Sequence, residues 1–119
     1  MSAVYRELVE RIRGETEELD RVAQRVTTAW ASVRRRPGED AYVDSVALNL
    51  HGFYSGLERL FELVIRHVDR SMPTGETWHR SLLKQVAQDF ADIRPAVISQ
   101  EIAVALDEFR RFRHLVRNV

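Results

Sequence analysis

Apolar residues recur every three or four positions along almost the whole chain and never alternate with polar residues for long. This spacing places them on one side of an α-helix, so it predicts an all-helical protein. The first predicted helix begins near Tyr5 and keeps one apolar seam for about thirty residues, ending at residues 36–38, Arg-Pro-Gly. Gly14 lies inside this segment and predicts a local weak point rather than a break, because glycine costs about 1 kcal/mol relative to alanine in a helix.

Three further helices are predicted by the same spacing. A second long helix carries an apolar seam from Val43 to Val68 and stops at the turn 71–75. Thr77 is the expected N-cap of a short third helix, whose apolar face we assign to Trp78, Leu82, Val86 and Phe90. Ser99 is the expected N-cap of the fourth helix, whose inward face we assign to Ile102, Ala105, Leu106, Phe109, Phe112 and Val116.

Two long helices, one short and one medium helix joined by short connections fit an up-and-down four-helix bundle. We expect residues 1–119 to form a single domain. The helices do not match in length, and a homodimer in which each subunit covers the other's overhanging seam would shield the unmatched ends. A kinked first helix folding back on itself is the simpler alternative.

Composition supports one globular unit and removes several functional classes. The 119 residues are 45% hydrophobic and 30% charged, which excludes a disordered or fibrous chain. Cysteine is absent, so disulfides and thiolate chemistry are excluded, and neither a membrane-spanning run nor a signal-peptide pattern is present. We therefore expect a cytoplasmic protein without a membrane anchor. Eighteen basic and eighteen acidic residues cancel, so any contact with nucleic acid must come from local clustering.

Metal and cofactor sites find little support. A di-metal bundle needs Glu-x-x-His pairs on two helices, and the one such pair, Glu76 and His79, straddles a loop and a helix start. We expect no metal and no cofactor. Gly52 and Gly56 are expected to allow close approach of another helix. The arginine run 34–36 complements the dipole at a helix C-terminus, with nucleic-acid contact as the alternative.

The fourth predicted helix carries a concentrated basic strip. At 100° per residue its cationic or titratable side chains fall within an arc of about 100°, with an amide just beyond; the residues are Arg110, Arg113, His114 and Arg117, followed by Asn118. Arginine forks suit phosphates, and histidine exchanges protons near neutral pH, so phosphodiester chemistry is possible. Alternatively the arginines pair with acids across the bundle, and the second predicted helix offers a polar strip of His51, Ser55, Glu58 and Glu62.

Segment 109–118, Phe-Arg-Arg-Phe-Arg-His-Leu-Val-Arg-Asn, resembles the last helix of the HEPN superfamily, and of HepT-like proteins in particular. Segments 50–59 and 75–79 strengthen the likeness. The resemblance implies a dimeric helical fold and the toxin of a toxin–antitoxin pair, whose antitoxin is a small nucleotidyltransferase of the MNT type. It also implies a metal-independent ribonuclease whose motif, an Arg, a polar residue, three positions, a His, one position and a Tyr, meets its copy at the dimer cleft.

Carried over by position, the motif Arg falls on Arg113 and its polar neighbour on His114, whereas the family His falls on Asn118. An amide cannot serve as a general acid or base, so general acid–base catalysis would pass to His114 or be lost. Arg110 and Arg117 would add to RNA binding. The motif Tyr, to which the antitoxin adds adenylate in related systems, would follow Val119.

Three hypotheses follow. The first is a HepT-like ribonuclease acting on RNA through Arg113, His114 and Asn118. The second is a catalytically silent HEPN-fold dimer that binds RNA or a nucleotidyltransferase antitoxin without turnover. The third is an unrelated helical interaction module in which Glu58 and Glu62 neutralise the basic strip.

Overall fold

The computed structural model of the chain describes residues 2–117, with side chains as far as Phe112. The described residues form four α-helices and one short π-helix, so the all-α fold class expected of a helical bundle is confirmed. The fold divides into two compact units, residues 1–60 and 61–119. The prediction of one domain over residues 1–119 stays a prediction.

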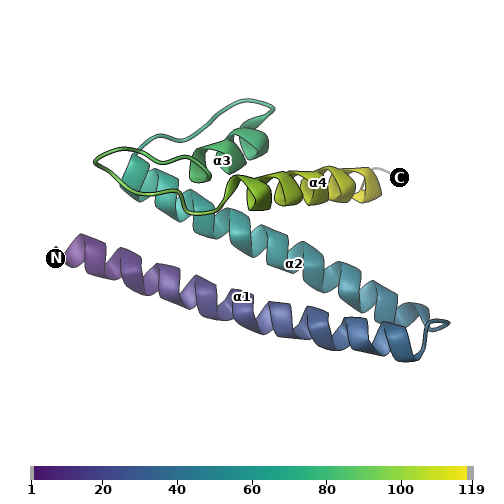
Figure 1. The fold of residues 1–119 in the computed structure, drawn as a ribbon. Coiled ribbons are helices and arrows are strands. Elements are labelled where there is room, and N and C mark those ends of the chain that lie inside the picture. The colour runs from purple at the N-terminus through teal and green to yellow at the C-terminus, as the bar shows by residue number, and fades with distance from the viewer. Residues whose placement is uncertain (1, 118–119) are drawn as a thin grey trace. The chain divides into compact units, whose positions relative to one another are not determined.

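Unit 1 is a hairpin of two long antiparallel helices, α1 (Ala3–Arg35) and α2 (Asp40–Val64) (Figure 1). The last turn of α2 belongs to unit 2. Ser2 caps α1, because its Oγ accepts a hydrogen bond of 3.2 Å from the backbone N–H of Tyr5. The helix passes through Gly14 without a break and ends where the sequence predicts.

Side chains from the two helices meet in an antiparallel register. A Cβ built on Gly56 of α2 would lie 2.7 Å from Leu19 Cδ2 of α1. One turn further, Arg59 Nε lies 3.7 Å from Glu15 Oε2. The predicted close approach of a helix at Gly56 is therefore confirmed, whereas a Cβ on Gly52 would meet nothing within 4 Å, so the same prediction is wrong at Gly52.

Unit 2 begins with the end of α2, which continues as a π-helix, η1 (Ile65–Asp69). Arg70 ends it in the left-handed conformation, with φ 56°. Helical backbone therefore extends through Val68, as predicted. The change from α to π geometry over the last turn, however, has no signal in the apolar spacing.

Helix α3 (Trp78–Val86) is shorter than predicted. Phe90, assigned to its apolar face, lies beyond it and pairs with Arg94 through two backbone hydrogen bonds of 3.0 Å. Thr77 precedes α3 but makes no side-chain cap bond, because its backbone (φ −102°, ψ 20°) lacks the extended conformation that directs a cap hydroxyl at the helix.

Helix α4 (Gln100–Arg117) contacts α3 within unit 2. Ser99 caps it as predicted, with its Oγ accepting a 3.1 Å hydrogen bond from the N–H of Ile102. The predicted inward face is wrong in part, because Ile102, Ala105 and Phe112 are exposed. Helix α3 has nine residues and spans about 13 Å, too short to cover the roughly 27 Å of α4.

The buried apolar side chains of unit 2 come from the end of α2, η1, α3 with its C-cap residue, and α4: Phe61, Leu63, Ile65, Leu82, Leu83, Val86, Ala87 and Ala103. Within the described part of the chain, no helix is long and apolar enough to cross a membrane.

Candidate functional site

Arg110 of the predicted basic strip and its neighbour Arg111 share one carboxylate of their own helix. Arg110 lies 2.9 Å from Asp107 Oδ1 through Nη2, and its Nε donates a 3.0 Å hydrogen bond to the same oxygen. Arg111 Nη2 lies 3.1 Å from Asp107 Oδ2. Among the described residues, the acid that pairs with Arg110 therefore comes from α4 itself.

The charge state of Asp107 follows from these contacts. Burial acts to raise the pKa of Asp107, but the hydrogen bonds and positive charges of Arg110 and Arg111 outweigh burial and hold its pKa below the usual aspartate range. Asp107 is therefore ionised at neutral pH, and the three side chains together carry one net positive charge.

The other residues of the predicted site lie at the end of α4. Arg113, His114 and Arg117 belong to the helix by their backbone, but their side chains lie outside the described part of the chain. Asn118 lies outside the described residues altogether. Their catalytic and RNA-binding roles stay predictions.

The polar strip predicted on the second helix is not one solvated face. On α2, His51 is exposed, Ser55 and Glu62 are half-buried, and Glu58 is only 9% exposed. Glu58 is therefore part of the packed interior. A carboxylate withdrawn from water in this way needs compensating partners.

A buried polar cluster in unit 2 joins the end of η1 to the segment after α3. Arg94 and Asp69 form a two-pronged ion pair, with Nε to Oδ1 and Nη2 to Oδ2 both at 2.6 Å. Their side chains are 7% and 3% exposed. Gln85 Nε2 adds a 2.9 Å hydrogen bond to Asp69 Oδ2 and a 3.0 Å bond to the Ser71 carbonyl.

Every N–H of the Arg94 guanidinium has an acceptor in this cluster. The three that do not bind Asp69 donate to the backbone carbonyls of Gln85, Gln88 and Pro95 at 2.9–3.1 Å. Burial acts to raise the pKa of Asp69, but hydrogen bonds from Arg94 and Gln85 and the charge of Arg94 lower it below the usual range. With all its donors used, the cluster stabilises the fold and offers no free group for chemistry.

Sequence reasoning missed this cluster. Asp69 and Arg94 are 25 positions apart and belong to a helix end and an irregular segment. No periodic pattern links such positions.

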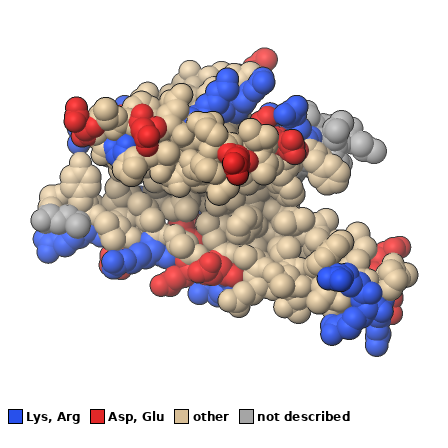
Figure 2. Space-filling model, in the orientation of Figure 1, with Lys and Arg blue, Asp and Glu red and all other residues tan. Residues whose placement is uncertain are grey.

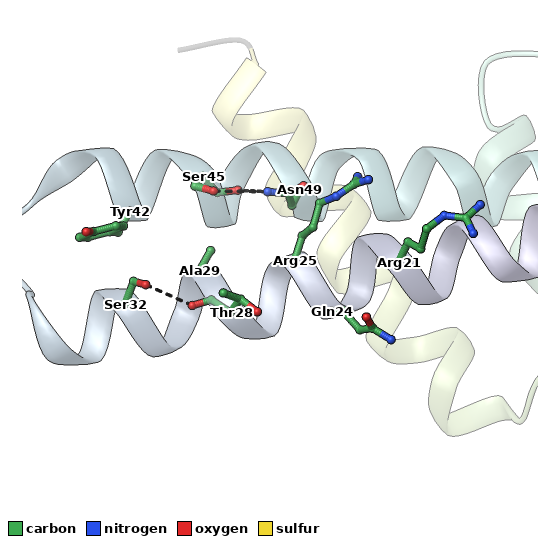
Figure 3. Close-up of a pocket in the computed structure, with 9 residues that line it drawn as sticks. All are labelled: Arg21, Gln24, Arg25, Thr28, Ala29, Ser32, Tyr42, Ser45 and Asn49. Atoms are coloured by element: carbon green, nitrogen blue, oxygen red, sulfur yellow. Dashed lines mark hydrogen bonds between the residues drawn. The ribbon is translucent and has the colours of Figure 1, made fainter.

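A groove lined mainly by residues with polar groups lies between α1 and α2 in unit 1, and sequence reasoning missed it as well (Figure 3). Its volume is about 590 Å³. No carboxylate lines it; the lining residues are Arg21, Gln24, Arg25, Thr28, Ala29, Ser32, Tyr42, Ser45 and Asn49. Ser45 and Asn49 are joined by a 2.8 Å hydrogen bond from Asn49 Nδ2 to the Ser45 carbonyl.

Metal ligation has no support among the described residues, which contain no group of three His, Cys, Asp or Glu that could hold an ion. Glu76 lies in the turn before α3, and His79 lies in its first turn, where its ring contacts Trp78 with centroids 3.7 Å apart. The two members of the Glu-x-x-His pair thus fall on different elements, as expected from the sequence.

Comparison with known families assigns the greater part of the chain to one family. The sequence model of the HepT-like protein family matches residues 45–119, which include most of α2 and all of α3 and α4. Searches among curated proteins and among solved structures each found no match. The match covers more than half of the 119 residues and overturns the hypothesis of an unrelated helical module. The chain therefore belongs to the family of HepT-like proteins.

Proposed function

We propose that this HepT-like protein is the toxin of a toxin–antitoxin pair, a metal-independent endoribonuclease that acts on RNA in the cytoplasm. The observation that carries the proposal is the family match over residues 45–119, because it includes the basic segment 109–118. The partner that follows from this assignment is a nucleotidyltransferase antitoxin of the MNT type. We keep residues 1–119 as one functional domain, since α2 runs through the boundary between the units.

The proposed reaction breaks an RNA phosphodiester without a metal. The 2′-oxygen attacks phosphorus as its proton is removed, and the bond to the 5′-oxygen breaks as that oxygen gains a proton. Arg113 and Arg117 hold the phosphate and stabilise its developing charge. His114 carries the protons, and Asn118 orients the phosphate through hydrogen bonds.

Arg110 has a smaller part in this proposal. Its guanidinium is held by Asp107 at 2.9 Å, and Asp107 also binds Arg111. A phosphate that binds Arg110 must compete with this carboxylate, so Arg110 contributes less to RNA affinity than the spacing of the strip suggests.

We propose that the active form is a homodimer. Apolar side chains of α4 face solvent in the single chain, with Ile102 at 50% and Phe112 at 63% exposed. A second copy that covers them would remove this apolar surface from water. Light scattering should therefore give twice the monomer mass, and Phe112→Glu should shift the protein to monomer.

A second candidate function rests on Asn118. The family motif has a His at this position, and an amide cannot act as a general acid or base. General acid–base catalysis supplies a factor of about 10² to 10⁴, so its loss could leave a silent dimer that binds RNA or the antitoxin without turnover.

Cleavage of labelled tRNA and mRNA in the presence of EDTA decides between the two. Arg113→Ala and His114→Ala are compared with wild type, and Arg13→Ala, an exposed arginine of α1, is the matched control purified in the same way. Cleavage that survives in Arg13→Ala and is lost in Arg113→Ala supports the ribonuclease. Equal cleavage in all four proteins indicates a contaminant and contradicts it, and no cleavage with retained binding supports the silent dimer.

A further inference from the structure

Acidic and basic residues are unevenly distributed along α1, although the net charge of the whole chain is zero. Residues 3–20 hold six acidic and three basic residues, whereas residues 21–36 hold five arginines and no acidic residue. Figure 2 shows basic side chains gathered at the end of the α1–α2 hairpin, at the lower right of the view, with acidic side chains beside them. The second half of α1 is therefore a local cation cluster within a neutral protein.

Three of these arginines lie on one side of the helix. At 100° per residue, Arg21, Arg25 and Arg35 fall within an arc of about 80°. Thr28 and Ser32 lie in the same arc. We call Arg21, Arg25 and Arg35 the α1 strip; it extends over about 21 Å at 1.5 Å per residue.

Two members of the strip make no ion pair with a described residue, although the charge of Arg25 also acts on Glu18 and helps to lower the pKa of that carboxyl. Arg21 pairs with Glu18 at 2.7 Å, but Arg25 and Arg35 make no ion pair with any residue that the structure describes. Arg35 Nη2 instead donates a 3.4 Å hydrogen bond to Ser32 Oγ, which lines the α1–α2 groove. Both side chains are exposed. The helix dipole explains a cation in the last turn, but Arg25 lies ten residues before the end of α1.

The strip and the groove form one surface. Arg21 and Arg25 line the groove from α1, and α2 contributes Tyr42, Ser45 and Asn49 (Figure 3). Hydroxyl and amide groups there can bind base edges and ribose, and the half-buried Tyr42 offers an aromatic ring. A volume of about 590 Å³ is of ligand size.

We infer that the α1 strip and the α1–α2 groove bind the backbone of single-stranded RNA, as a surface separate in sequence from the predicted α4 motif. The inference rests on the proposed function for its ligand class. A strip of guanidinium groups matches successive phosphates, and the groove accepts an unpaired nucleotide, which a duplex cannot supply. An acidic protein partner is the alternative occupant, and competition by polyglutamate in the experiment below separates it from RNA.

Binding of a fluorescein-labelled 2′-O-methyl oligouridine, measured by anisotropy over a series of salt concentrations, tests this surface apart from catalysis. The probe lacks the 2′-hydroxyl nucleophile, so it cannot be cleaved by the proposed reaction. Arg25→Ala and Arg35→Ala should each weaken binding about tenfold, which is about 1.4 kcal/mol for the loss of one charge-assisted contact. Each should also reduce the slope of log K against log salt by about 0.7.

Arg34→Ala is the matched control. Arg34 is exposed and occupies the same last turn as Arg35, so it shares the dipole effect but faces away from the strip. Binding should change less than twofold in Arg34→Ala. Thermal melts of each variant show whether the fold is kept, and Arg25→Lys should recover part of the affinity.

Three results would overturn the inference. They are no binding of the oligouridine, equal losses in Arg34→Ala and Arg35→Ala, and displacement of the probe by polyglutamate as readily as by unlabelled RNA. The last would identify an acidic protein as the occupant. Failure of the proposed function has a different signature, absence of cleavage in the wild type, so the two outcomes are distinguishable.

Discussion

Arg25 in unit 1 and Arg94 in unit 2 are both arginines, but Arg25 is exposed to solvent and the side chain of Arg94 is buried. Arg94 is 7% exposed, and each of its five N–H groups has an acceptor. Arg25 is exposed and makes no ion pair with a described residue. An arginine with all donors used holds the chain together, whereas one left in water is available to a ligand.

The same contrast extends to the two units. The ion pairs within α1, such as Arg13–Glu10 and Arg21–Glu18, join residues three apart on an exposed surface. In unit 2 the Asp69–Arg94 pair closes a segment of 25 residues. Loss of the Asp69–Arg94 pair should therefore destabilise unit 2, whereas loss of one of the exposed pairs within α1 should leave the helices of unit 1 nearly unchanged.

The largest effect should come from the buried cluster. Arg94→Ala leaves Asp69 charged and buried without its main partner, which should lower the free energy of unfolding by about 3–5 kcal/mol. Arg25→Ala, the exposed counterpart, should change it by less than about 0.5 kcal/mol. Urea denaturation measures both, and similar values for the two variants would remove the contrast between the units.

The pH dependence of stability should sharpen the role of Asp69. Its pKa is lowered in the folded state, so its ion pair stabilises the protein above the unfolded pKa, about 3.9 for aspartate. This stabilisation is lost as the pH falls through the folded pKa. The difference in melting temperature between wild type and Asp69→Asn should thus narrow toward acidic pH; a gap that stays constant would show that the ion pair does not depend on the charge.

Two glycines of α2 give a matched pair in unit 1. Gly56→Ala places a Cβ 2.7 Å from Leu19 Cδ2. The resulting overpacking, about 1–3 kcal/mol, exceeds the gain of about 1 kcal/mol in helix propensity. We expect a net loss of about 1 kcal/mol in unfolding free energy. Gly52→Ala has open space and should instead gain about 0.5–1 kcal/mol. Equal effects of the two substitutions would contradict the close approach at Gly56.

A comparably small effect concerns the caps in unit 2. Ser99→Ala removes the hydroxyl that accepts from the N–H of Ile102, which should lower stability by about 1 kcal/mol. Thr77→Ala should have little effect, because Thr77 makes no cap bond. Thermal melts of the two variants check this, and a larger loss in Thr77→Ala would mean that its hydroxyl caps α3 in solution.

Local patterns in the sequence predicted most of the fold. The apolar seam, the Pro-Gly pair at 37–38 and Ser99 placed α1, α2 and the start of α4 correctly. The prediction for α3 was wrong at Phe90, because a single apolar residue at helical spacing does not show that the backbone has already left the helix to pair with Arg94. The exposed Phe112 was predicted to face inward because spacing shows a common face but not whether a neighbour is long enough to cover it.

The sequence alone supplied the family, which the comparison confirmed over residues 45–119. It also supplied the α4 motif residues, whose roles stay predictions. Only the tertiary structure decided that Arg94 is buried with Asp69, that Arg110 shares Asp107 with Arg111, and that Arg25 borders a groove. Helix formation and family likeness depend on residues close together in the chain, which a linear pattern can show. Burial and pairing depend on which distant groups meet and on how much water they exclude, and these are properties of the packed molecule.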